Sequence, residues 1–462
     1  MFEAKVYQER RKKLKETLGS GILLFLGNEE SPMNYFDNVY HFRQDSTFLY
    51  FWGMDYPSLG AVIDLDEDKE ILFGDELSID MIVWMGTQPT LKDRAGKAGI
   101  NEVMSYSSLH EYLAKNKKRK IHFLPPYRYE NKIKLHQMLD LPIEKIEENK
   151  SAEFIKAVVA QREIKSAEEI VELDKAVSIS ADMHIAAMKM ARPGMKESEV
   201  AARIQEVAVA AGGQLSFPII CTINGQTLHN HYHGNTIGEN DLLLVDAGAE
   251  TDTHYAGDLS HTFPINSKFT MKQKEIYQIA LNAHNAAVEM LRPGNKMLDV
   301  HFTAARTISE GMKDLGLMKG DLDEAVRQGA HALFFQCGTG HMMGLDVHDM
   351  EDLGEQYVGY DENIKKETQL FGLKSLRLGK ELKPGFVFTI EPGIYFIPEL
   401  IDMWKAENRF ADFINYDRVE EYKGWGGCRS EEDFLITEDG KRLLGKDVPK
   451  TIEDIEEIRS NI

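Results

Sequence analysis

The chain has 462 residues, which is long for one domain, and 43% of them are hydrophobic, enough to fill more than one core. Its formal net charge of −21 at pH 7 argues against nucleic-acid binding, because contacts to phosphates need a basic face that the sequence lacks. The composition therefore predicts two or three folded domains and no nucleic-acid partner.

The cysteines and the apolar runs bear on the cellular compartment. Cys221, Cys337 and Cys428 are widely spaced and form no Cys-x-x-Cys pair, which favours a reducing compartment over a disulfide scaffold or a thiolate zinc site. Residues 1–18 read as a charged amphipathic helix without the apolar core of a signal peptide, and the longest apolar runs are too short to span a bilayer. We therefore predict a cytoplasmic protein that does not interact with membranes.

The first part of the chain alternates short strands with helical or loop segments, as an α/β domain does. We predict strands at 22–26, 59–65, 70–73 and 121–124. The basic run Lys117–Lys120 is interpreted as the loop before the last of them. A long polar helical stretch, 151–175, then leads into the rest of the chain. We place the boundary near 160, which gives domains at 1–160 and 161–462.

The second part contains an internal repeat. Residues 184–194 match residues 284–294 at an offset of 100 positions, and each copy is a helix stopped by Arg-Pro-Gly. Two copies are too few for a solenoid. The repeat predicts a duplicated half-domain with a cleft at the pseudo-twofold axis, where each half contributes ligands.

A buried strand in the first copy ends in a carboxylate. Residues 242–245 are apolar and precede Asp246, and a buried Asp must be neutral, paired or bound to a metal. Asp252, in the polar turn 251–253, is the midpoint between Asp246 and Asp258. A hairpin without a bulge places these two directly opposite, with Cβ atoms roughly 4.5 to 5.5 Å apart. A divalent cation keeps such a pair ionised; the alternative is two solvated Asp on an ordinary hairpin.

Further candidate ligands lie in the second copy. His341 is in the Gly-rich turn 338–344, Glu391 ends a strand, and period-2 alternation puts Glu431 on the same face as Arg429. Each alone has a structural alternative, namely a hydrogen-bonded histidine, a solvated strand end or a surface acid. Together they form an oxygen-rich set that suits two divalent ions such as Mn²⁺ or Co²⁺ better than a structural zinc ion.

Other histidines and a serine offer alternatives. His229, His231 and His233 lie on one face of an extended chain, so they either form a small independent metal site or place one imidazole in the cleft. His348 is a further cleft candidate. Nucleophilic catalysis by Ser260 is disfavoured, because its neighbour His261 points to the other face of the strand and no Gly-x-Ser-x-Gly elbow exists.

These residues resemble the pita-bread metallopeptidases, and the match is closest to the branch of aminopeptidase P and prolidase. The first domain resembles that branch's N-terminal domain over residues 42–50, a domain that methionine aminopeptidases lack. The other motifs that carry the resemblance are His231-Tyr232, Asp246-Ala247-Gly248, Gly257-Asp258 with 262–264, Gly340-His341 with 344–349, Glu391-Pro392-Gly393 and 429–433. The resemblance covers nearly the whole chain. It implies an α/β (α+β) architecture, with an N-terminal mixed-sheet domain followed by a pseudo-twofold pita-bread catalytic domain.

The resemblance also implies a pair of metal ions, most readily Mn²⁺, with Co²⁺ or Zn²⁺ as alternatives. Asp246 would chelate one ion, His341 and Glu391 would ligate the other, and Asp258 and Glu431 would bridge them. Two divalent ions roughly 3.5 to 4 Å apart would share a hydroxide that is nucleophilic at neutral pH, and they would polarise the scissile carbonyl.

The same resemblance assigns roles to residues around the metals. Glu391 would accept a proton from the attacking water and then donate it to the leaving nitrogen. Arg429 would orient the carboxylate of Asp246, while His231 and His348 would hydrogen-bond the substrate or the tetrahedral intermediate.

Two positions depart from the family pattern. Cys337 stands four residues before His341, where the family usually has a histidine, and a thiol is a poor substitute for an imidazole donor. The spacing between Asp246 and Asp258 is one residue longer than in aminopeptidase P, which a bulge in the turn would absorb.

The resemblance implies a Xaa-Pro aminopeptidase, which removes the first residue of proline-containing peptides. The alternatives are a prolidase, which cleaves only Xaa-Pro dipeptides, and more remotely an inactive binding module on the same fold. A creatine amidinohydrolase shares the architecture but works without metal, so the complete ligand set argues against it. Proteins of this branch often form homo-oligomers, here a dimer or tetramer, through the first domain, where Trp84 is a candidate contact.

Overall fold

The computed structural model describes residues 1–461, which form two compact units. Unit 1 contains residues 1–162 and the segment 351–357, and unit 2 contains the rest of the described chain. The units divide after Arg162, two residues from the predicted boundary. No helix among the described residues is long and apolar enough to cross a membrane.

The predicted helical stretch over 151–175 is divided between two helices. Helix α8 (Ala152–Arg162) ends before a four-residue break, and α9 (Ala167–Met190) begins after it. Ser166 caps α9 through a capping box with Glu169, and this local signal starts a new helix.

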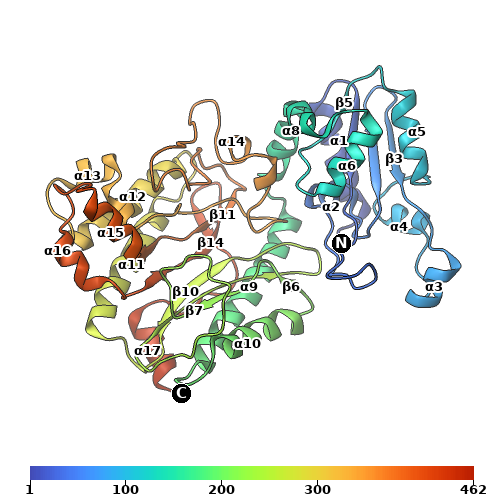
Figure 1. Cartoon of the computed structure of the whole chain (residues 1–462). Helices are drawn as coiled ribbons and strands as arrows, with labels where there is room; N and C mark the ends of the chain where they lie inside the picture. The colour runs from blue at the N-terminus through green and yellow to red at the C-terminus, as the bar shows by residue number, and fades with distance from the viewer. Residues whose placement is uncertain (462) are drawn as a thin grey trace. The chain divides into compact units, whose positions relative to one another are not determined.

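Unit 1 is built on a mixed five-stranded sheet with strand order β4-β3-β2-β1-β5 (Figure 1). The pairs β1–β2 and β2–β3 are antiparallel, whereas β1–β5 and β3–β4 are parallel. The four predicted strands are present, some of them shorter than expected. The three-residue β4 is too short to show an alternating pattern, so the sequence did not indicate it. The bounds are β1 (Ile22–Leu26), β2 (Gly60–Asp64), β3 (Lys69–Phe73), β4 (Glu102–Met104) and β5 (Ile121–His122).

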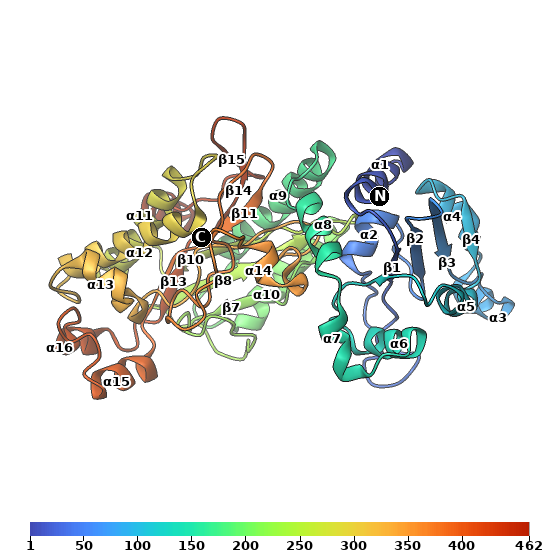
Figure 2. The same cartoon turned by 90° about the horizontal axis from the view of Figure 1, so that it is seen from above.

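Helices cover both faces of this sheet (Figure 2). Side chains such as Ile22 and Leu24 pack with residues of α5, α6 and α7, whereas Phe25 contacts Phe51 and Phe154 on the other face, as strand alternation requires. The remaining helices of the unit, besides α8, are α1 (Ala4–Thr17), α2 (Ser46–Trp52), α3 (Ile79–Met85), α4 (Leu91–Lys97), α5 (Ser107–Lys115), α6 (Tyr129–Leu139) and α7 (Ile146–Asn149).

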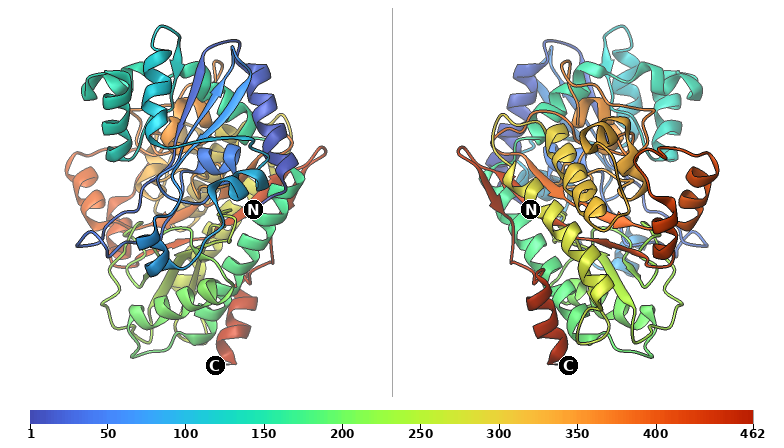
Figure 3. Two further views of the ribbon diagram at one scale, coloured as in Figure 1. Left: turned by 90° about the vertical axis from the view of Figure 1, so that its right-hand side faces the viewer. Right: turned by 90° about the vertical axis from the view of Figure 1, so that its left-hand side faces the viewer.

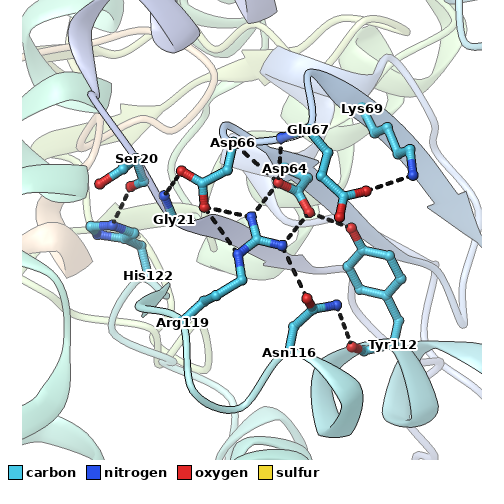
Figure 4. A network of polar contacts seen from close by, with 10 residues as sticks. All are labelled: Ser20, Gly21, Asp64, Asp66, Glu67, Lys69, Tyr112, Asn116, Arg119 and His122. Carbon is cyan, nitrogen blue, oxygen red and sulfur yellow. Dashed lines mark hydrogen bonds and ion pairs between the residues drawn. The ribbon is translucent and has the colours of Figure 1, made fainter.

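A polar network closes the end of this sheet where β2 turns into β3 (Figure 4). The buried carboxylate of Asp64 accepts hydrogen bonds from Arg119 Nη1 at 2.8 Å and from Tyr112 Oη at 2.5 Å. Arg119 Nε also donates to Asp66 at 2.9 Å. Burial by itself raises the pKa of Asp64, but the hydrogen bonds from Arg119 and Tyr112 outweigh it and lower the pKa to about 2.

Removing the cation of this network should destabilise unit 1. In Arg119→Ala the buried Asp64 carboxylate loses its partner, and we expect a loss of about 2 kcal/mol, less than for a fully buried pair because the guanidinium is partly exposed. Urea unfolding measures it. Lys69→Ala, which breaks an exposed pair with Glu67 on the same hairpin, is the control and should leave the midpoint nearly unchanged. Equal midpoints for the two variants would show that the network is unimportant.

Unit 2 contains the predicted duplication. Helices α9 and α10 (Glu197–Ala210) repeat as α11 (Met271–Glu289) and α12 (Met297–Asp314), seen in Figure 3 as a green pair and a yellow-to-gold pair. Gly194 and Gly294 have φ of +89° and +87°, so each turn needs a residue without a side chain. The two glycines also make equivalent backbone hydrogen bonds: Gly194 N donates to Ile237 O at 2.8 Å, and Gly294 N donates to Leu382 O at 3.0 Å.

Small sheets lie between the helices of the two halves. The main ones have the orders β10-β8-β7 and β11-β14-β15, with β12-β13 and β6-β9 as two-stranded sheets. The strands are β6 (Gln214–Leu215), β7 (Ile220–Thr222), β8 (Leu242–Ala247), β9 (Ala249–Glu250), β10 (Leu259–Pro264), β11 (Val387–Ile390), β12 (Gly393–Tyr395), β13 (Gly427–Arg429), β14 (Glu432–Ile436) and β15 (Lys441–Leu443). The helices not yet named are α13 (Leu322–Gln328), α14 (Glu355–Val358), α15 (Pro398–Ala406), α16 (Tyr416–Val419) and α17 (Ile452–Ser460).

The hairpin from β8 to β10 corrects the predicted register. Asp246 lies opposite Ser260, so Asp258 is its diagonal neighbour on the same face rather than its direct partner. The centre of the turn is Thr253, one residue later than predicted, because His254 adopts a left-handed conformation with φ of +70°. The longer spacing between the aspartates is therefore absorbed by the loop.

Candidate metal centre

Two carboxylates of the centre come from the first half of unit 2. Asp246 is the fifth residue of β8, and Asp258 directly precedes β10. They are 6% and 5% exposed, and burial raises the pKa of each to about 6. Proximity adds to this effect at Asp246, because the charge of Asp258 raises its pKa further. These carboxyls therefore favour a cation close by.

His341 faces this pair from the second half. Its segment is extended beside β11 rather than tightly turned: Thr389 N donates to His341 O at 3.0 Å, and a Cβ on Gly340 would meet Thr389 O at 1.9 Å. His341 Nδ1 lies 3.1 Å from the carbonyl of Met342, so that nitrogen carries the hydrogen. Nε2 keeps its lone pair and lies 3.3 Å from Asp258 Oδ2.

Two glutamates complete the set from the ends of neighbouring strands. Glu391 follows β11, and its Oε1 lies 3.7 Å from His341 Nε2. Glu431 precedes β14, and its backbone N donates to Ser260 O at 2.9 Å, which ties it to the first half. Burial raises the pKa of Glu391 to about 8 and also raises that of Glu431.

The five predicted ligands converge. Three groups of three residues each bring one ligand atom per residue within 4.8 Å of the others. These groups are Asp246 with Asp258 and Glu431, His341 with Glu391 and Glu431, and Asp258 with His341 and His348. Asp258 Oδ1 is buried without a hydrogen-bond partner among the described residues. Five clustered carboxylate and imidazole groups with an orphaned oxygen fit divalent cations, and the shared members fit two of them.

Arg429 contacts Asp246 directly. One terminal nitrogen donates to Asp246 Oδ2, the other donates to Tyr395 Oη at 3.0 Å, and Nε donates to Ser260 Oγ at 2.9 Å. Its Nε lies 3.9 Å from Glu431. Tyr395 was not predicted as a site residue, although period-2 alternation from Glu391 through Gly393 places it on the same side.

The histidine segment is arranged differently from the prediction of a three-histidine face. His229 and His231 are both exposed, and His233 Nε2 donates to Ile219 O at 3.0 Å. The pKa of His229 is lowered by desolvation and by the positive charge of Arg429, against which the carboxylate of Asp246 acts. His233 is therefore held by the backbone, whereas His229 is within range of the charges of the centre.

Two further residues near the centre were not predicted. Asp433 Oδ2 accepts a hydrogen bond from Asp258 N at 3.1 Å and is fully buried, so it supports a candidate ligand through the backbone. Arg377 exerts charge interactions on both His229 and Glu391. Neither carries a local sequence signal, because an isolated arginine or an acidic run is normally a surface feature.

Comparison with known proteins assigns the family. The model of metallopeptidase family M24 matches residues 171–438, and that of the aminopeptidase P N-terminal domain matches residues 7–123. The chain belongs to metallopeptidase family M24, and it carries the aminopeptidase P N-terminal domain in unit 1.

Individual relatives are similar along nearly the whole chain. Human Xaa-Pro dipeptidase is 31% identical over 456 residues, covering 97% of this chain and 90% of the relative. Xaa-Pro aminopeptidase of Escherichia coli is also 31% identical, covering 97% and 96%. A variant of E. coli aminopeptidase P in complex with substrate superposes with a TM-score of 0.82 at 29% identity, covering 100% of this chain and 99% of that one.

Proposed function

We propose that the chain is a Xaa-Pro aminopeptidase, which releases the N-terminal residue from peptides with proline in second position. The observation that carries the proposal is the convergence of Asp246, Asp258, His341, Glu391 and Glu431 on one buried centre. The near-complete coverage of both chains in the superposition on E. coli aminopeptidase P supports it.

The ligand set supports two divalent ions, with Mn²⁺ as the first candidate and Co²⁺ or Zn²⁺ as alternatives. Zinc is included because a similar solved structure is that of Zn-substituted E. coli aminopeptidase P in complex with product. Asp246 would hold one ion, His341 and Glu391 the other, and Asp258 and Glu431 would contact both. When bound, the ions supply a hydroxide nucleophile at neutral pH and polarise the scissile carbonyl.

The protein's own residues would transfer protons, orient a metal ligand and bind the substrate. Glu391, whose Oε1 lies 3.7 Å from His341 Nε2 in the centre, would accept a proton from the attacking water and return it to the leaving nitrogen. Arg429 holds the Asp246 carboxylate in place. His348, whose ring centroid is 3.9 Å from that of His341, would hydrogen-bond the substrate carbonyl. We assign the corresponding role in the 229–233 segment to His231, with His229, whose pKa is influenced by Arg429 and Asp246, as the alternative.

The activity is tested with a peptide panel. After chelation, Mn²⁺, Co²⁺ and Zn²⁺ are each added back, and release of the first residue from Xaa-Pro-Xaa, Xaa-Pro and Xaa-Ala-Xaa peptides is measured. We expect metal-dependent cleavage of Xaa-Pro-Xaa and little cleavage of the alanine peptide. A purified chain without bound metal or metal-dependent hydrolysis would instead favour a binding module.

A prolidase is the second candidate, because human Xaa-Pro dipeptidase is 31% identical along nearly the whole chain. The charge of Arg377 acts on Glu391 and His229, and we propose that this cation would bind the free carboxylate of a Xaa-Pro dipeptide. If the chain is a dipeptidase, Arg377→Met should raise KM for Xaa-Pro at least about tenfold, the loss of about one charge-assisted pair. An aminopeptidase should show the same small change for Xaa-Pro-Xaa and Xaa-Pro.

Cys337 offers a test of the departure from the family pattern. Burial raises the pKa of this thiol to about 12, so it is uncharged, and its Sγ lies 4.0 Å from Tyr395 Oη. Cys337 belongs to none of the three candidate ligand groups. Cys337→His should therefore leave metal content unchanged and raise kcat/KM about tenfold by adding an imidazole donor. Loss of metal from this variant would show that Cys337 holds the centre together, and Cys221→Ser is the thiol control.

The compartment and the oligomeric state of the protein are also proposed. We infer a cytoplasmic enzyme that acts on proline-containing peptides and forms a homo-oligomer. Helix α3 supports association, since none of its residues is buried and Trp84 is 85% exposed. Size-exclusion chromatography with light scattering, on the native chain and Trp84→Glu, tests this.

A further inference from the structure

Two histidines outside the metal centre occupy equivalent positions in the internal repeat. His184 lies on α9 and His284 on α11, and each is 1% exposed. Burial lowers the pKa of His184 to about 4 and that of His284 to about 3, so both imidazoles are neutral. Neither has a role in the proposed reaction.

His184 contacts the strand pair that carries both aspartates. Its Nε2 lies 3.0 Å from the carbonyl oxygen of Ala247, and because a carbonyl only accepts, Nε2 must be the donor. Ala247 directly follows Asp246 and pairs in register with Leu259, which directly follows Asp258. A single hydrogen bond from α9 therefore fixes the paired backbone residues that directly follow the two aspartates.

In the second half, His284 lies beside a side chain rather than a backbone carbonyl, and neither of its ring nitrogens has a hydrogen-bond partner among the described residues. Its Nε2 lies 3.4 Å from Oε2 of Glu432, the residue after Glu431. Glu432 pairs in register with Ile390, the residue before Glu391. The second copy's histidine therefore also contacts a residue adjacent to a candidate ligand.

His261 is a neighbour of His184. It is fully buried on β10, and its ring centroid is 5.0 Å from that of His184 in an edge-on arrangement. Burial lowers the pKa of His261 well below its usual value. Because side chains alternate along β10, His261 points away from its neighbour Ser260, which contacts Arg429 in the metal centre. His184 and His261 are therefore two adjacent buried imidazoles on the side of β10 away from Arg429.

We propose that His184 is a positioning residue, which holds the backbone bearing Asp246 and Asp258 in the geometry required for metal binding. The proposal rests on the proposed metal function. It treats the hydrogen bond from α9 as a support for the two aspartates from behind their strands.

Direct metal titration of the whole chain tests the proposal. Chelator-stripped native protein, His184→Leu, His184→Gln and His184→Asn are titrated with Mn²⁺ by calorimetry. Leucine removes the donor, and Asn is too short to replace Nε2, so both should weaken Mn²⁺ binding at least about tenfold. Gln reaches as far as Nε2 and should stay within about threefold of native. Met188→Leu, a buried change one turn along the same helix, should have no effect on metal affinity.

The kcat of the metal-loaded His184 variants should fall while KM stays constant, since His184 touches no substrate. If the Leu variant does not fold, the comparison of Gln with Asn still decides, because both are amides of similar polarity. Equal affinity for Gln and Asn variants, or native affinity in all of them, overturns the positioning role alone. A native chain that binds no Mn²⁺ overturns the proposed function itself.

Discussion

Replacing Asp258 by Asn should abolish turnover. Asp258 belongs to two of the three candidate ligand groups, and its Oδ2 lies 3.3 Å from His341 Nε2. Asn keeps one oxygen but loses the charge and the second acceptor, so it cannot serve two cations at once. We expect kcat/KM to fall at least about 10³-fold, equivalent to about 4 kcal/mol of barrier.

Metal content and activity are measured together in this variant. The native chain should bind two metal ions, and Asp258→Asn should bind one or none. Asp252→Asn is the control, because Asp252 lies in the loop of the same hairpin and pairs with Lys175 at an exposed position. Near-normal turnover in Asp258→Asn would remove this residue from the centre.

The candidate ligands were predictable because each has a local signal. A run of buried strand residues that ends in an acid occurs at Asp246 and again at Glu391, and burying such an acid requires a compensating charge. The repeat placed these two strands in equivalent halves. Local pattern and duplication together were sufficient to place both carboxylates in one centre.

The hairpin register was not predictable from the same pattern. A strand pair can shift by two residues without moving any side chain to the other face, so alternation alone does not distinguish the two registers. The choice depends on the loop, where His254 takes a positive φ that a non-glycine residue adopts only when its surroundings support it. His254 Nδ1 hydrogen-bonds Glu250 across that loop, a contact without sequence signature.

Residues that act across long sequence distances were also missed. Arg377 lies 148 positions from His229, and Tyr395 reaches Arg429 from a different strand. Neither has a local motif. Only the folded chain shows that their side chains approach the centre.

The second large effect concerns the metal-free protein, which should lose stability as the pH rises from 6.5 to 8. Burial raises the pKa of Glu391 to about 8, so this carboxyl is largely protonated in the folded chain at pH 6.5 and half ionised at pH 8. Burial also raises the pKa values of Glu431 and Asp433 well above their usual range. In the unfolded chain these carboxyls are ionised above pH 5. The folded state therefore binds more protons, and the free energy of unfolding falls as pH rises.

The expected size follows from linkage. Each carboxyl that remains protonated only in the folded state contributes about 1.4 kcal/mol per pH unit. We expect a loss of at least about 2 kcal/mol between pH 6.5 and 8.

Urea unfolding in chelator and in excess Mn²⁺, at pH 6.5 and 8.0, measures the effect. Bound Mn²⁺ should remove the loss, since the carboxylates are then ionised and paired at both pH values. Glu391→Gln provides the matched variant: its metal-free form lacks the carboxyl whose pKa of about 8 lies at the edge of this window, so its loss of stability should be smaller than that of the native chain. If the metal-free native chain is equally stable at both pH values, these acids are not held protonated by burial. The buried carboxyls would then lack the unfavourable ionisation that a bound cation relieves.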